Sequence, residues 1–273
     1  MNLTDIYAVR LQADVRKRII INSHKTKTPH LGSCLSCIDI LVALYYYILR
    51  IDPKDSTNPL RDRFILSKGH AAPALYQVLA IKGFYPESLL DDYGKNGSYF
   101  AEHPPAPGCI PGIEAVTGSL GHGLPIGVGM ALAAKIRKQD YRVYVLLSDG
   151  ECNEGSVWEA ALFASAKQLN NLTVIVDYNK WQATGRSNEI MKLEPLLEKF
   201  KSFGFHGEEI DGHKIPILVN KIKEIETNAT TPSIIIANTI KGCGVSFMED
   251  DNNWHYRIPT AQEVELACRE LSC

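Results

Sequence analysis

Short apolar runs alternate with helical spacing over most of the chain. Residues 143–147 and 172–176 are apolar runs of strand length, and each ends in a polar cluster. The segment between them carries apolar residues at helical spacing, which is typical of a helix that covers a sheet. This order predicts a strand, a crossover helix and a parallel strand. The residues expected on one face of that helix are Trp158, Ala161, Leu162, Ser165 and Leu169.

The same alternation continues on both sides of this unit. It predicts an α/β fold with a mostly parallel sheet flanked by helices on both faces. A length of 273 residues is enough for one large core, so we expect residues 1–273 to form a single domain. The further predicted strands are residues 63–66, 205–210 and 233–238, and the further predicted helices are residues 1–22, 36–49, 194–203 and 215–227.

The composition is that of a globular protein with no membrane span. Apolar residues make up 45% and charged residues 22%, and a net charge of −2 gives no footprint for nucleic acid or an anionic membrane. The apolar stretch at residues 40–49 is too short to cross a bilayer. Seven scattered cysteines argue against a secreted disulfide framework, and Cys34-x-x-Cys37 has no second pair at zinc-finger spacing. We therefore expect packed thiols and a cytoplasmic protein.

Polar residues with metal-binding chemistry follow both apolar runs of the central unit. Asp149 and Gly150 come directly after the first run, and Asn179 follows the second. Carboxyl ends of parallel strands are where open α/β sheets bind ligands. Mg²⁺ prefers oxygen ligands, and these segments offer a carboxylate, an amide oxygen and a backbone carbonyl near Trp181. Phosphates and water would complete the coordination shell of the ion. Gly150 would let the backbone approach a phosphate. On these residues alone, a plain βαβ unit with turn residues at its strand ends remains the alternative.

The spacing of these residues resembles a known motif. Asp149-Gly150, then 28 residues, then Asn179 resembles the diphosphate and metal motif of thiamine diphosphate enzymes, with Ser148 where that family usually has glycine. Further segments occur in the order found in transketolases, so the chain resembles their N-terminal, diphosphate-binding domain. These segments are His30-Leu31-Gly32, RFILSKGHAAPALY with His70, His103-Pro104, PGIEAVTGSLGHGL, and KGCGVSFMEDDNNWH ending at His255.

The resemblance implies thiamine diphosphate and Mg²⁺ (or Ca²⁺ or Mn²⁺) as cofactors, and it assigns four histidines to a catalytic channel. His70 and His255 would mainly contact the diphosphate, and His30 and His103 would mainly contact sugar hydroxyls. Imidazole can donate to an alkoxide or a diphosphate near neutral pH. The implied cofactor-binding residues are His70, His255, Gly118, Leu120, Gly150, Glu154 and Asn179, and the implied metal ligands are Asp149, Asn179 and the backbone carbonyl of Trp181.

Two residues near these motifs have further or open roles. The family match makes Glu154 an interface acid that links the two active sites of a dimer. His122 stands where many transketolases carry glutamine, and it either contacts the cofactor or packs at a helix start.

The stretch from Gly121 to Gly127 is no dinucleotide fingerprint, because a loop and not a strand precedes it. His24, His206 and His213 match no motif.

The resemblance also implies missing parts. Transketolases exceed twice this length, adding a pyrimidine-binding domain, whose glutamate activates the cofactor, and a C-terminal domain. We expect both domains on a separate chain, in an α2β2 heterotetramer that acts on sugar phosphates, and we expect the single chain to be inactive.

The loop at residues 91–115 leaves the substrate open. It contains His103, so we expect it to line the active site, but it lacks the expected arginine and has Glu102 in place of glycine. An acid there should discourage anionic substrates. Ketol transfer between pentose phosphates and ketol transfer for a specialised sugar or secondary metabolite both remain. Two further alternatives are a synthase of the deoxyxylulose-phosphate-synthase type and a non-catalytic cofactor-binding module.

Overall fold

A parallel sheet forms the centre of the chain in a computed structural model that describes residues 3–227 and 229–272. The five strands have the order β1-β2-β3-β5-β4, and every neighbouring pair is parallel. The predicted α/β class is confirmed. The strands are β1 (Arg63–Leu66), β2 (Val143–Ser148), β3 (Leu172–Tyr178), β4 (His206–Asp211) and β5 (Ser233–Asn238).

The register brings the strand ends together. Ser148 pairs with Asp177, and Tyr178 pairs with Asn238, so β2, β3 and β5 end at the same edge. Every residue of β2 and β3 is buried. Both faces of these strands are covered, which explains why they read as continuous apolar runs.

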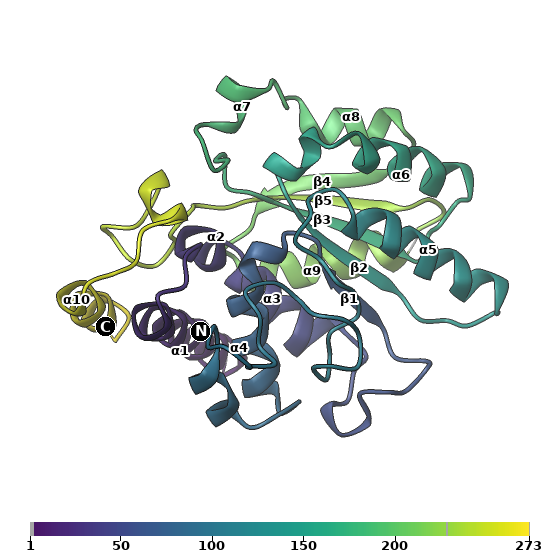
Figure 1. Ribbon diagram of the computed structural model, residues 1–273. Helices are drawn as coiled ribbons and strands as arrows, with labels where there is room; N and C mark the ends of the chain where they lie inside the picture. Colours follow the sequence, from purple (N-terminus) through teal and green to yellow (C-terminus); the bar gives the residue numbers. More distant parts are fainter. Residues whose placement is uncertain (1–2, 228, 273) are drawn as a thin grey trace.

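Helices cover the sheet on both faces, as Figure 1 shows. Alternate strand residues enter two separate cores: Tyr144 and Leu146 pack on one side, and Val143 and Val145 on the other. The first side is covered by α1 (Leu3–Thr26), α3 (Ile38–Ala43), α4 (Ala72–Lys82) and α9 (Ile215–Thr227), and the second by α5 (Gly123–Ile136), α6 (Gly155–Ala166) and α8 (Leu196–Ser202). Among the helices of the described residues, none is both long and apolar enough to cross a bilayer.

Several helix predictions need correction. The helix expected to begin at residue 36 begins instead at Ile38 with α3 and continues as a π-helical turn (Leu44–Ile48). Ser36 is the last residue of a separate helix, α2 (Leu31–Ser36), and the break lies at Cys37. The helix expected at residues 1–22 continues to Thr26, and its first two residues lie outside the described residues. A helix that the sequence reading missed, α10 (Ala261–Glu270), begins at Thr260 with a capping box.

The face predicted for α6 is wrong at Leu162, which is 59% exposed. The buried face of α6 consists of Val157 and three alanines. Small side chains let the helix lie close to the sheet, so the larger Leu162 projects outward. Trp158 is partly buried and packs on Phe200.

Candidate functional site

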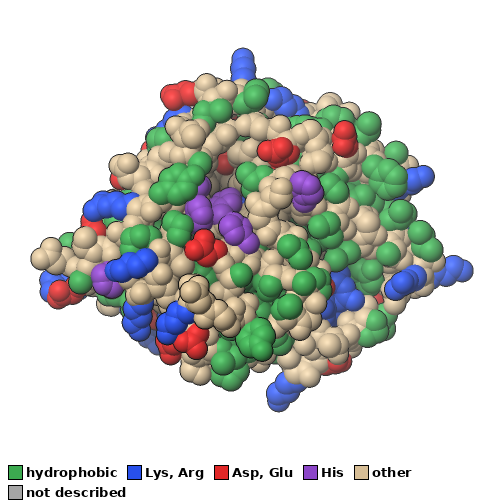
Figure 2. Space-filling model, in the orientation of Figure 1, with side chains coloured by type: hydrophobic (Ala, Val, Ile, Leu, Met, Phe, Trp, Pro, Cys, Tyr) green, Lys and Arg blue, Asp and Glu red, His purple; other side chains and the backbone are tan. Residues whose placement is uncertain are grey.

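A cavity of about 350 Å³ lies beyond the carboxyl ends of β2 and β3. Figure 2 shows histidine side chains gathered in a hollow on this face of the molecule. The four histidines predicted for the channel all line this space, which we call the histidine cavity: His30, His70, His103 and His255.

Backbone geometry places each histidine. His30 precedes α2 in the left-handed region (φ 72°), and its N–H donates to the carbonyl of His255 (2.8 Å). His70 lies in the turn (Gly69–Ala71) that follows β1. A Cβ at Gly118 would lie 2.8 Å from the His103 ring, so glycine makes room for that side chain.

The four rings form one cluster. The ring centre of His30 lies 4.8 Å from that of His255, 5.5 Å from His70 and 6.4 Å from His103. Burial, with nearby cations and imidazoles, lowers the pKa of His30 to about 4 and that of His255 to about 3. Burial also lowers the pKa of His70 well below its usual value. These three imidazoles are therefore neutral near pH 7, and each can donate and accept a hydrogen bond.

Lys241 orients His255, although the sequence analysis predicted no role for this lysine. This fully buried lysine donates to Asn252 Oδ1 (2.6 Å) and His255 Nδ1 (3.1 Å). Since Nδ1 accepts, the ring proton lies on Nε2. Burial and the neighbouring Lys68 lower the pKa of Lys241 to about 8. A Cβ at Gly32 would lie 2.8 Å from Lys241 Cγ, so the glycine of the His30 segment makes room for this lysine.

Two of the predicted metal ligands, Asn179 and Trp181, line the same cavity, and the third, Asp149, lies behind this lining. Asp149 is fully buried, and its Oδ2 accepts from Lys180 N (2.9 Å) and Ser187 Oγ (2.8 Å). Asn179 Oδ1 accepts from Trp181 N (3.1 Å), and both of these residues line the cavity. Burial raises the pKa of Asp149 to about 6.

The residues present fit a charged, polar ligand. The raised pKa of Asp149 reflects a buried carboxylate with too little positive charge around it, which a divalent cation would supply. Three buried polar atoms along the cavity have no hydrogen-bond partner: His30 Nδ1, Asn153 Oδ1 and Gln182 Nε2. Buried polar atoms are rarely left unpaired, so these atoms mark a binding surface.

A buried ion pair lies beneath the cavity, and the sequence reading missed it. Lys68 and Asp177 contact each other with no exposed side-chain surface, and Lys68 Nζ also donates to Ser33 O (2.9 Å). Burial alone would raise the pKa of Asp177, but Lys68 and hydroxyls from Ser36 and Thr239 bring it below its usual value. Lys68 stands in the quoted SKGH segment, although nothing in the sequence marked it as buried.

Some of the remaining predicted residues line the cavity, and others do not. Gly118, Leu120, Gly150 and Glu154 line it. The exposed His122 lies outside the lining; its Nδ1 is 3.0 Å from Leu120 O, and α5 begins directly after it. Glu102 is exposed and also lies outside the lining, although the adjacent His103 belongs to it.

Residues that the sequence left unassigned are held by structural contacts. Cys34 and Cys37 are buried and unpaired, as expected for packed thiols. His213 approaches Asp39 and Cys243 closely enough to suggest a metal site. However, Arg16 binds the Asp39 carboxylate through two nitrogens (2.7 and 3.2 Å), so its charge is already compensated.

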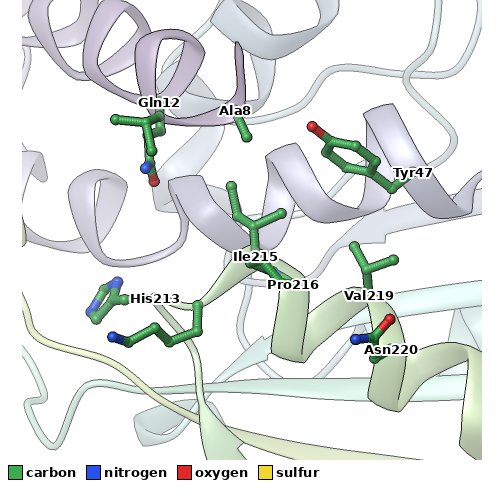
Figure 3. A pocket seen from close by; sticks show the side chains of 10 residues that line it. Ala8, Gln12, Tyr47, His213, Ile215, Pro216, Val219 and Asn220 are labelled. Carbon is green, nitrogen blue, oxygen red and sulfur yellow. The ribbon is translucent and has the colours of Figure 1, made fainter. Parts of the chain in front are cut away.

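A larger cavity of about 520 Å³ lies elsewhere, between α1 and α9. Figure 3 shows its wall: Ala8 and Gln12 from α1, Tyr47, and Ile215, Pro216, Val219 and Asn220 from α9. The lining is mostly apolar and contains none of the predicted site residues. The chemistry of the smaller histidine cavity therefore makes it the candidate active site.

Comparisons with known proteins identify the family of the chain. A family model described as "Transketolase, thiamine diphosphate binding domain" matches residues 11–272. The chain belongs to the transketolase family. This confirms the resemblance to the N-terminal, diphosphate-binding domain of transketolases.

Two similar relatives are transketolase subunits of comparable length. The chain is 42% identical to one subunit of the apulose-4-phosphate transketolase of Phocaeicola vulgatus, over 94% of this chain and 91% of the relative. It is 40% identical to 6-deoxy-6-sulfo-D-fructose transketolase subunit SqwG of a Clostridium species, over 94% and 93%.

The chain is much shorter than a transketolase of known structure to which it is similar. The transketolase of Campylobacter jejuni superposes with a TM-score of 0.90 at 29% identity, over all of this chain and 43% of that chain. This transketolase-family chain thus spans about two fifths of a transketolase of known structure.

Proposed function

We propose that this chain is the diphosphate-binding subunit of a two-chain transketolase, which transfers a two-carbon ketol unit from a ketose to an aldose. The observation that carries this proposal is that four histidines and Asn179 line one cavity, while the buried Asp149 lies directly behind its lining residue Gly150. The match to relatives named as transketolase subunits, over 91% or more of their length, supports it.

The cavity wall would hold thiamine diphosphate and a divalent cation. Asp149, Asn179 and the backbone carbonyl of Trp181 would bind Mg²⁺, which prefers oxygen ligands. Gly150 and the cationic Lys241 suit the diphosphate. When bound, thiamine diphosphate supplies the nucleophilic carbon that takes up the ketol unit.

The histidines would bind and orient the sugar. His30 and His103 can donate to sugar hydroxyls, and the Nε2 proton of His255 can point to an oxygen of sugar or diphosphate. A neutral imidazole can take a proton from a hydroxyl and return it. In the tautomer that Lys241 selects, the free ring nitrogen of His255, Nε2, carries the proton and can donate a hydrogen bond.

A partner chain would complete the site. It would bring the glutamate that activates the cofactor and the pyrimidine pocket, in an α2β2 heterotetramer with Glu154 at the interface. The length match to relatives that are themselves named as subunits supports a second chain. The cytoplasm stays the predicted compartment.

Isolation and reconstitution test the proposal. The tagged chain would be isolated from its own cell with Mg²⁺ and thiamine diphosphate and weighed by native mass spectrometry. We expect a second chain in equal number and ketol transfer only by the pair. Ketol transfer at normal rates by the single chain would refute the two-chain proposal. A chain that binds no cofactor with any partner would favour the binding module, and pyruvate consumption would favour a synthase.

A specialised sugar is the second candidate substrate class beside pentose phosphates. The relatives described above are named for apulose-4-phosphate and for 6-deoxy-6-sulfo-D-fructose, and Glu102 stands where transketolases have glycine. Restoring the arginine and glycine before His103 and comparing kcat/KM for phosphorylated and neutral acceptors tests the loop. A gain confined to phosphorylated acceptors would show that this loop selects against them.

A further inference from the structure

Two loops meet at one wall of the histidine cavity. The 180–187 loop follows β3 and contributes Trp181, Gln182, Ala183 and Thr184 to the lining. The 250–256 loop lies beyond β5 and contributes His255 and Tyr256. The position of this wall therefore depends on how the two loops are joined.

Asp250 makes the main connection between them. Its carboxylate accepts from both terminal nitrogens of Arg186 (2.7 and 2.6 Å) and from Trp181 Nε1 (2.8 Å). The Arg186 guanidinium also lies over the Trp181 ring, 3.8 Å from its centre. Two-pronged arginine–carboxylate bonds and stacked guanidinium groups fix geometry better than a simple ion pair.

The 180–187 loop is a small unit that Asp250 can hold as a whole. Gln182 N donates to Gly185 O (2.8 Å), and Ser187 N donates to Lys180 O (3.0 Å). The two ends of the loop, Lys180 N and Ser187 Oγ, both donate to Asp149 Oδ2. A shift of the loop would therefore move the proposed metal ligand Trp181 and disturb both of these hydrogen bonds to the proposed ligand Asp149.

A second contact joins the loops deeper in the wall. Asn252 donates to Ala183 O (3.1 Å) and accepts from Lys241 Nζ. Asp250 N donates to Lys241 O (2.8 Å). The connection thus runs from the proposed metal side of the cavity to the lysine that orients His255.

We infer that Asp250 is a positioning residue that holds the 180–187 loop closed and thereby slows the release of the bound divalent cation. This role rests on the proposed function, because it needs a cation at Asp149. Asp250 and Arg186 have side chains 54% and 35% exposed, and exposed ion pairs are weak. Without ligand, the closed position of the 180–187 loop is therefore only slightly favoured over an open one. A cation that binds only when the loop is closed would increase the closed population.

The test uses Asp250→Asn with Glu198→Gln as its matched control. Asp250 has a positive φ (57°), which asparagine also tolerates, so this change removes the charge and keeps the backbone. Glu198 forms an exposed ion pair with Lys201 on α8, away from the cavity. Arg186→Met is the second variant, because it breaks the same pair from the other loop.

Hydrogen exchange on the full chain without cofactor tests the closure. We expect the amides of Gln182 and Ser187 to exchange about fivefold faster in Asp250→Asn and Arg186→Met, the scale of one exposed ion pair. The control should exchange like the wild type, and all melting temperatures should agree. Unchanged exchange in both variants would overturn the role of Asp250.

Cation release from the assembled enzyme tests the consequence. With thiamine diphosphate saturating, we expect Mg²⁺ to leave Asp250→Asn about five- to tenfold faster, with kcat at saturating Mg²⁺ unchanged within about twofold. Faster exchange with unchanged release would overturn the positioning role alone. A wild-type assembly that binds no Mg²⁺ would overturn the proposed function as well.

Discussion

The buried charges beneath the histidine cavity and those directly behind its lining differ in how they are compensated. Beneath it, Lys68 and Asp177 contact each other with no exposed surface. Behind the lining, Lys241 and Asp149 are equally buried, but their hydrogen-bond partners are neutral groups such as Asn252 and the Ser187 hydroxyl. The pKa of Asp177 is lowered and that of Asp149 is raised to about 6.

This difference separates a structural charge pair from a binding site. A buried charge is costly unless a partner compensates it. The lower pair compensates itself, so it holds β1 and β3 in place. Behind the lining, burial outweighs the nearby opposite charges at Lys241 and Asp149, so a diphosphate and a divalent cation would together complete their compensation. Perturbed pKa values in a cavity mark candidate functional groups in this way.

Breaking the lower pair should have the largest effect on stability. We expect Asp177→Asn to lower the free energy of unfolding by about 3–5 kcal/mol, because it leaves Lys68 buried without a counter-charge. Urea unfolding of the chain measures this. The double variant Lys68→Met/Asp177→Leu should be more stable than the single variant. Equal losses would show that packing and not charge is responsible.

Asp149→Asn should behave in the opposite way. Removal of an uncompensated carboxylate should leave the free energy of unfolding unchanged or slightly higher, since burial disfavours its charge. Mg²⁺ affinity of the assembled enzyme should fall about 100- to 1,000-fold, as for loss of one partner of a buried pair. Calorimetric titration measures the affinity. A large loss of stability with unchanged affinity would reverse the roles of the two aspartates.

Lys241→Met should weaken diphosphate binding about 10- to 100-fold, the scale of a hydrogen bond to a charged group. In the wild type, affinity for inorganic diphosphate should fall as the pH rises through about 8, where Lys241 loses its proton. The variant should lack this dependence. The control Lys221→Met removes a partly exposed lysine on α9, outside the cavity. Identical pH profiles in Lys241→Met and wild type would contradict this role.

His255 should make a smaller contribution that depends on pH. Its pKa is lowered from 6.5 to about 3 in the folded chain, so the unfolded chain binds more protons between these values. Stability therefore falls as the pH decreases below 6.5. Between pH 7 and pH 5, we expect the free energy of unfolding of His255→Gln to fall by about 1 kcal/mol less than that of the wild type. Urea unfolding at both pH values measures this difference. His24→Gln, outside the cavity, serves as the control.

The strands, and the position of the proposed metal-binding side chains at one sheet edge, could be predicted from the sequence for a common reason. Continuous apolar runs mark strands buried on both faces, and the polar residues after them must meet at one sheet edge. The buried lysines were missed because a lysine in sequence reads as solvated. Only the neighbouring positions of β1, β3 and the segment after β5 show that Lys68 and Lys241 are enclosed.

Helix details were harder to predict because packing decides them. Leu162 fits an apolar stripe, but alanines allow closer contact with the sheet and occupy the inner face. The break at Cys37 has no turn residue to mark it. For α10 a signal was present, since Thr260 and Glu263 have the capping-box spacing.

The hydrogen bond from His30 to His255 has a consequence for the timing of synthesis. The two residues stand near opposite ends of the chain, and β4 is an edge strand whose neighbour β5 is made after it. Contacts between such distant segments form slowly. The nascent protein therefore has no complete cavity until residue 255 has left the ribosome, and binding of cofactor to the complete cavity can only follow that step.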